Sequence, residues 1–168
     1  MTISGIRLFS SNNLESLGLF KELVGSKNQT VVNSIRNLKL KPNQVNATKT
    51  DAVGTLAGIV ENFNLYNITL DSPNLVVLGG NAVGGIAGIV RGKVDIDGLS
   101  SNVSVTSTRA ISAYNYSIYN SIPSGYENSE NLTDVYYAGS VIGVIDAYST
   151  SNPAGQIRAL NATTYSKV

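Results

Sequence analysis

A short pattern of apolar and polar positions recurs four times along the chain. Each copy has an apolar residue, any residue, Gly or Asn, another apolar residue and then any residue. The copies begin at residues 3, 35, 65 and 96, so successive starts lie 32, 30 and 31 residues apart. A period of this size predicts stacked supersecondary units, because one such unit cannot bury its apolar face alone.

A second phrase, rich in Gly and apolar residues, alternates with the first. Its copies span residues 17–20, 53–60, 83–90 and 138–145, and the second and third match at six of eight positions. Short apolar runs with interspersed Gly predict strands that turn one face to a core, with Gly at bends or close backbone approaches. Stacked strands lie about 4.8 Å apart, so we expect a side chain at Gly58 or Gly88 to collide with the unit above. The structural glycines of the phrase are Gly18, Gly54, Gly58, Gly84, Gly88, Gly139 and Gly143.

Polar links rich in turn-forming residues separate the two phrases. Residues 41–43 and 71–74 each carry Pro after a polar residue and before Asn, which predicts a turn in both copies. Residues 13–25 are also compatible with a helix that has Asn13 as its cap. Their alignment with the later copies through Gly18 favours a strand, or a strand followed by a single turn.

The regular spacing fails after residue 106. The fourth Gly-rich copy starts 55 residues after the third, at 138 rather than one period after 83, so we expect an insertion of about one unit at residues 106–134. Tyrosine offers a large, rigid contact area with a polar tip, so the tyrosines of this segment are the candidate binding residues, unless some pack back onto the stack. They are Tyr114, Tyr116, Tyr119 and Tyr126. We therefore expect one domain over residues 1–168, with regular units at 3–105, the insertion at 106–134 and a last unit and cap at 135–168.

Composition narrows the possible chemistry. Of 168 residues 42% are hydrophobic and 14% charged, with a net charge of +1, so the chain can build a core and has no basic stripe for nucleic acid. It has no Cys and no His, which rules out disulfides, zinc sites of the usual N/S kind and the commonest general base. No apolar stretch approaches the roughly 18 residues that a membrane span needs. We expect no cofactor, no nucleic-acid partner and no membrane insertion.

Acidic residues are the remaining candidates for catalysis or metal binding. Asp95 and Asp97 flank Ile96, so in a strand both point to one side, where they either begin a Ca²⁺ site or form a solvated face. The eleven acids are otherwise spread thinly, unlike the concentration of carboxylates in a catalytic groove. Glu61 and Arg91 occupy corresponding positions of successive units, which allows a mixed ladder of charges on the surface. We therefore expect no catalytic residue and no metal site.

The chain also contains seven Asn-x-Ser/Thr sequences, at Asn28, Asn46, Asn67, Asn102, Asn115, Asn131 and Asn161. They are either acceptors for glycosylation, in a host with that machinery, or part of an Asn-, Ser- and Thr-rich surface. Asn67 belongs to the first repeated pattern, and we expect it to turn inward, where a glycan fits poorly.

Together the two phrases resemble the GLUG-type repeats of bacterial surface proteins. The resemblance rests on Gly-Leu-Phe at 18–20, Ile-x-Asn-Leu-x-Leu at 35–40 and Val-Gly-Gly-Ile-Ala-Gly at 83–88. It covers about residues 3–105 and returns at 135–145. Such repeats occur in large adhesins and in the non-catalytic N-terminal parts of the immunoglobulin A1-cleaving metallopeptidases of Gram-positive bacteria. The resemblance implies an all-β fold, a right-handed parallel β-helix (β-solenoid) that we expect to have about four to five coils, and it carries no catalytic residues.

The expected function is a non-catalytic structural or adhesive role in a secreted or cell-surface bacterial protein, with a host or matrix glycan or protein as partner. Because the first copy begins at residue 3, we interpret the chain as an excerpt of a longer protein or a mature form after processing. Flanking domains or neighbouring copies are then expected to cover the ends of the stack. The alternatives are a non-catalytic N-terminal module of a large secreted metallopeptidase and a carbohydrate-active β-helix enzyme.

Overall fold

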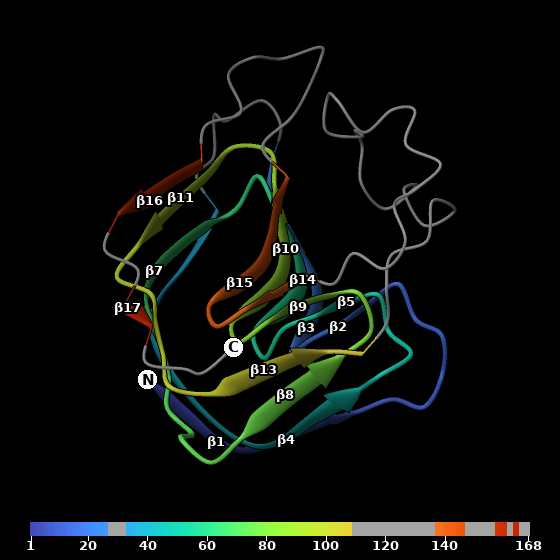
Figure 1. Cartoon of the computed structure of the whole chain (residues 1–168). Coiled ribbons are helices and arrows are strands. Elements are labelled where there is room, and N and C mark those ends of the chain that lie inside the picture. The colour runs from blue at the N-terminus through green and yellow to red at the C-terminus, as the bar shows by residue number, and fades with distance from the viewer. Residues whose placement is uncertain (27–32, 109–136, 147–156, 161–162, 165–168) are drawn as a thin grey trace, which may run out of the picture.

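The fold was analysed in a computed structural model, which describes residues 1–26, 33–108, 137–146, 157–160 and 163–164 (Figure 1). Every regular element in these ranges is a β-strand, and no helix lies among them. The all-β prediction is therefore confirmed for this part of the chain. The strands are β1 (Thr2–Phe9), β2 (Ser16–Leu17), β3 (Phe20–Val24), β4 (Ser34–Ala47), β5 (Ala52–Val53), β6 (Ala57–Glu61), β7 (Asn64–Leu70), β8 (Val76–Gly79), β9 (Ala82–Gly84), β10 (Ala87–Arg91), β11 (Val94–Asp97), β12 (Ser100–Ser101), β13 (Ser104–Ser107), β14 (Tyr137–Gly139), β15 (Ile142–Asp146), β16 (Ile157–Leu160) and β17 (Thr163–Thr164).

The described strands form three sheets, in which every pairing is parallel. Sheet A has nine strands. Six of them follow the order β13-β8-β4-β7-β11-β16; β1 pairs with β4, and β12 pairs with both β7 and β17. Sheet B has the order β14-β9-β5-β2, and sheet C has the order β15-β10-β6-β3. Figure 1 shows sheet A curling like half of a barrel, with the strands of sheet C across the interior from it.

Each Gly-rich phrase forms two strands joined by a short bend, a unit that we call an arch. The arches are β2–β3, β5–β6, β9–β10 and β14–β15. In sheet C, Ala57 pairs with Ala87, thirty residues on, and Ala87 pairs with Ile142, 55 residues on. These registers confirm the alignment of the last three copies, including the one that follows the break in the period. The strand prediction for residues 13–25 is also confirmed, since β2 and β3 lie there.

The first repeated pattern stacks as predicted in three of its four copies. Ile35 of β4 pairs with Leu65 of β7, and Leu65 pairs with Ile96 of β11. The expectation for the first copy, that residue 3 stacks on residue 35, is wrong, because Ile3 of β1 pairs with Leu40 of β4. Backbone conformation unites the copies instead, since their Gly or Asn position has a positive φ in all four. The φ angles are 73° at Gly5, 57° at Asn37, 51° at Asn67 and 67° at Gly98.

One of the two predicted Pro–Asn turns is a turn and the other is not. The N–H of Leu75 donates to the carbonyl of Ser72 at 2.9 Å, which closes a turn between β7 and β8. Pro42, by contrast, lies within the 14-residue strand β4. It falls after the last pair of β4 with β7 and before the first pair with β8, so its missing N–H removes no ladder hydrogen bond on that side.

The core is divided in two by sheet C. The main cluster holds buried residues from all three sheets, among them Leu65, Val90 and Val83, and extends from Ile6 in the first strand to Val141 in the last arch. The smaller cluster lies between sheets B and C and consists of Ala52, Ile59, Ala82 and Ile89. Sheet C therefore has apolar contacts on both faces, which explains why β6 and β10 read as continuous apolar runs rather than alternating ones.

Candidate functional site

Sheets B and C approach one another closely at the glycines of the arches. A Cβ atom built at Gly58 would lie 2.6 Å from Cβ of Ser16 and 2.7 Å from the backbone nitrogen of Leu17. A Cβ at Gly88 would lie 2.6 Å from the nitrogen of Val53. At both glycines the two nearest atoms belong to the preceding unit of the stack; they lie mainly in the facing sheet B, and the carbonyl oxygen of Gly58 in sheet C lies 2.7 Å from the Cβ built at Gly88. The structural role of these glycines stays a prediction that substitution can test.

Polar side chains also form contacts between successive units. The guanidinium Nε of Arg91 donates to Oε2 of Glu61 at 2.8 Å, and both side chains are mostly buried, at 19% and 17% exposed. This contact confirms the expected ladder at that position. The amide of Asn81 donates to Asp51 at 2.8 Å, thirty residues away. Sequence analysis did not identify this second contact. The signal that could have found it is the spacing of Asp51 and Asn81 by one repeat period.

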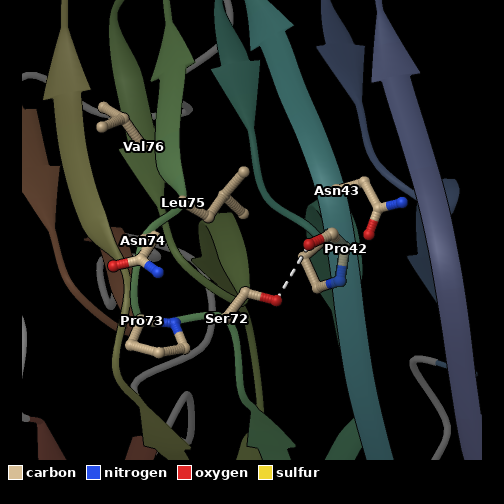
Figure 2. Close-up of a pocket in the computed structure, with 7 residues that line it drawn as sticks. All are labelled: Pro42, Asn43, Ser72, Pro73, Asn74, Leu75 and Val76. Carbon is tan, nitrogen blue, oxygen red and sulfur yellow. Dashed lines mark hydrogen bonds between the residues drawn. The ribbon is translucent and has the colours of Figure 1, made fainter.

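The turn between β7 and β8 lines a hollow on the surface. Figure 2 shows this open pocket, whose volume is about 270 Å³. Its lining consists of Pro42, Asn43, Ser72, Pro73, Asn74, Leu75 and Val76. The hydroxyl of Ser72 donates to the carbonyl of Pro42 at 2.9 Å and so ties the two walls together. The lining offers amides, a hydroxyl and aliphatic carbon, and none of these lining side chains is ionisable.

A charged cluster lies beside this pocket. Oδ2 of Asp71 lies 2.7 Å from Nζ of Lys39 and 3.7 Å from Nζ of Lys41. The amide of Asn102 donates to the other carboxylate oxygen at 2.9 Å. The hydrogen bond from Lys39, followed by that from Asn102, holds the pKa of Asp71 below its ordinary value. Asp71 thereby links residues from three successive units.

Asp95 and Asp97 lie on the outer face of sheet A. In β11, Val94 and Ile96 are buried, whereas Asp95 is half-buried and Asp97 is exposed. No group of three or more His, Cys, Asp or Glu side chains that could hold a metal ion occurs in the described ranges. This geometry matches the solvated strand face, which was one of the two interpretations of the sequence.

Two further sequence predictions have different outcomes. Asn67 is exposed, so the expectation that it turns inward is wrong; its amide donates to Oδ1 of Asn37 at 3.1 Å on the surface. The proposed binding tyrosines, Tyr114, Tyr116, Tyr119 and Tyr126, lie outside the described residues. Their role stays a prediction.

Comparison with known proteins gives no relative for this chain. No family model, curated protein or solved structure matches it significantly. Within the described ranges there is also no helix of the length and apolar character that crossing a membrane requires.

Proposed function

We propose that this chain is a right-handed parallel β-solenoid of about four to five coils, with a Tyr-rich insertion. We propose further that it is a non-catalytic structural or adhesive module of a secreted or cell-surface bacterial protein. The observation that carries the proposal is the repeated parallel register, in which strand partners recur about thirty residues apart and share one core. Such a scaffold presents an extended surface and derives its stability from contacts between neighbouring units.

The chemistry of the described surface supports a binding role rather than a catalytic one. The pocket beside the β7–β8 turn has no ionisable lining residue. The carboxylate in the charged cluster beside it, Asp71, is engaged by Lys39 and Asn102 in contacts between units. A carboxylate that accepts these bonds acts as a tie between repeats, and it is not positioned as an acid or base in a groove.

The proposed partner is a host or matrix glycan or protein, and the proposed contact surface is the Tyr-rich segment. The similarity of the two phrases to GLUG-type repeats supports a location outside the cell or on its surface. The partner's identity follows from binding experiments, since the fold alone does not define it.

A binding experiment on the whole chain tests this function. The purified protein is applied to a glycan array and to immobilised collagen and fibronectin, and bound protein is measured by fluorescence. We expect saturable binding to at least one probe without release of product. Replacing Tyr114, Tyr116, Tyr119 and Tyr126 together by Ser is expected to abolish it.

Tyr66 provides a matched control, because it is a tyrosine of the regular strand β7 whose ring lies 5.5 Å from the guanidinium of Arg36. Tyr66→Ser is expected to bind like the wild type. Binding that survives the fourfold substitution contradicts the role of the segment. Turnover of any glycan contradicts the non-catalytic proposal.

A further inference from the structure

The N-terminal edge of sheet C has the properties of a self-pairing surface. β3 is the terminal strand of this sheet among the described residues and pairs on one side only, with β6. Two of its apolar side chains are open to solvent, with Phe20 42% and Val24 57% exposed, whereas Leu23 is buried in the main core. An unpaired strand edge with exposed apolar residues is a template for pairing with another chain.

Two adjacent residues of β3 depart from the repeated phrase. Phe20 pairs with Ala57 and Glu22 pairs with Ile59, so Lys21 lies opposite Gly58. The other arches carry Gly followed by Ile or Val at these two positions, and only the first carries a base followed by an acid. The corresponding pairs are Gly58 and Ile59 in β6, Gly88 and Ile89 in β10, and Gly143 and Val144 in β15.

In the inner arches this pair of positions is closed to water and to additional atoms. Ile59 is fully buried between sheets B and C. A single Cβ at Gly58 would already approach Ser16 to 2.6 Å. A further unit stacked against the free edge of β3 would place Lys21 and Glu22 in this same environment. Burying charged groups there is unfavourable, because they lose hydration and the tight space offers no room for compensating partners.

In the structure, Lys21 and Glu22 instead form an ion pair with each other. Nζ of Lys21 lies 3.5 Å from Glu22 and 3.9 Å from Glu15, and the Lys21 side chain is 64% exposed. These exposed contacts add little to the stability of the monomer. Their position on the edge strand is therefore better explained by what they prevent.

We propose that Lys21 and Glu22 block the N-terminal edge of sheet C against a second copy of this chain. The second copy is the fitting partner because its strand β15, which pairs only with β10 among the described strands, carries the corresponding phrase Gly143–Val144, and every pairing within sheet C is parallel. With Gly and Ile at positions 21 and 22, the free edge of β3 would present the same pattern that β6 presents to β3. This inference rests on the register of sheet C and is independent of the adhesive function.

The variant Lys21→Gly/Glu22→Ile tests the proposal without changing the net charge. Sedimentation velocity and light scattering are measured over a wide range of protein concentration. We expect the wild type to stay monomeric and the variant to reach at least twice the monomer mass as concentration rises. The control is Lys93→Gly/Asp97→Ile, which likewise replaces a base by Gly and an acid by Ile, just before and within β11, a strand paired on both sides. We expect the control to stay monomeric.

Three results overturn the proposal. They are association of the wild type, a monomeric double variant with the wild-type circular dichroism spectrum, and equal association of the control. If the double variant loses its strand spectrum, Glu22→Ile alone decides the question, since it keeps the backbone propensity of position 21 unchanged. A folded Glu22→Ile protein that stays monomeric at every concentration then overturns the proposal.

Discussion

At the scale of single residues, the repeated patterns encode backbone requirements before they encode contacts. The alternation of Gly and Asn at the third position of the first pattern follows from its positive φ, such as 57° at Asn37 and 67° at Gly98. Gly and Asn are the residues that adopt this conformation most readily. The Gly of the arches answers a different requirement, since Gly58 is constrained by neighbouring atoms and has no positive φ.

The first prediction follows from that difference. Gly58→Ala is expected to lower the free energy of unfolding by about 1–3 kcal/mol, because the new Cβ overlaps Ser16 and backbone atoms that cannot move cheaply. The measurement is urea unfolding monitored by circular dichroism. Gly5→Asn is the control, since a Cβ there meets nothing within 4 Å and Asn67 adopts a similar φ of 51° in another copy. We expect the control to stay within about 0.5 kcal/mol of the wild type. A Gly58→Ala protein of wild-type stability contradicts the tight approach of sheets B and C.

At the scale of elements, pattern matching predicts local conformation better than it predicts stacking partners. Residues 3–8 match the first pattern, yet β1 pairs with the second half of β4. The motif specifies a positive φ and flanking apolar residues, and these fit against more than one stretch of a strand as long as β4. The predicted turn at Pro42 is wrong for a related reason. A Pro–Asn pair favours a turn, but strand β4 continues through it, at a place where β4 pairs with neither β7 nor β8.

The second prediction belongs to this scale and concerns the pKa of Asp71, in the segment between β7 and β8. Because the hydrogen bond from Lys39 lowers that pKa in the folded state, ionised Asp71 stabilises the fold at pH values above its ordinary pKa of 3.8. This contribution is lost as the pH falls through the lowered folded-state pKa. Asp71→Asn is therefore expected to unfold more easily than the wild type at neutral pH, with a difference that shrinks and disappears in acid. Urea unfolding of both proteins across this pH range measures it.

Removing the partner separates the ion pair from other effects of the substitution. Lys39→Met deletes the largest cause of the lowered pKa and leaves the carboxylate in place. The free energy of unfolding of this variant should therefore fall less than that of the wild type as the pH is lowered. High salt should reduce the difference at neutral pH, because these side chains are partly exposed, at 41% for Lys39 and 29% for Asp71. An equal difference between wild type and Asp71→Asn at all pH values would show that the carboxylate's charge plays no part.

At the scale of the whole molecule, the predictable part of the fold is the part in which copies are nearly identical. Sheet C follows from aligning residues 53–60 with 83–90, because six identical positions leave one register that places apolar residues together. The division of the core by sheet C did not follow from the pattern, since a run of buried residues looks the same whether one face or both are covered. The pocket depends on the two Pro–Asn segments adopting different structures, which no comparison of their sequences indicates.

The third prediction concerns how stability is distributed along the stack. β6 and β10 are paired on both sides, and Ile59 and Ile89 are fully buried. Among the described strands β3, by contrast, pairs on one side only, and its Phe20 is exposed. In a stack that is coupled mainly between neighbours, terminal units open more readily than inner ones. Hydrogen exchange followed by mass spectrometry should therefore show the slowest exchange in peptides covering β6 and β10, and exchange at least about tenfold faster in β1 and β3.

The substitution Ile89→Ala turns this distribution into a test of coupling. It opens a cavity between sheets B and C and is expected to cost about 2–5 kcal/mol. Exchange should accelerate most in β10 and in β6, which lies beside it in sheet C, and least in β1, which pairs only with β4 among the described strands. If exchange instead rises by the same factor in every strand, the described part of the chain opens as one all-or-none unit, because the main core from Ile6 to Val141 couples the ends as strongly as the neighbours.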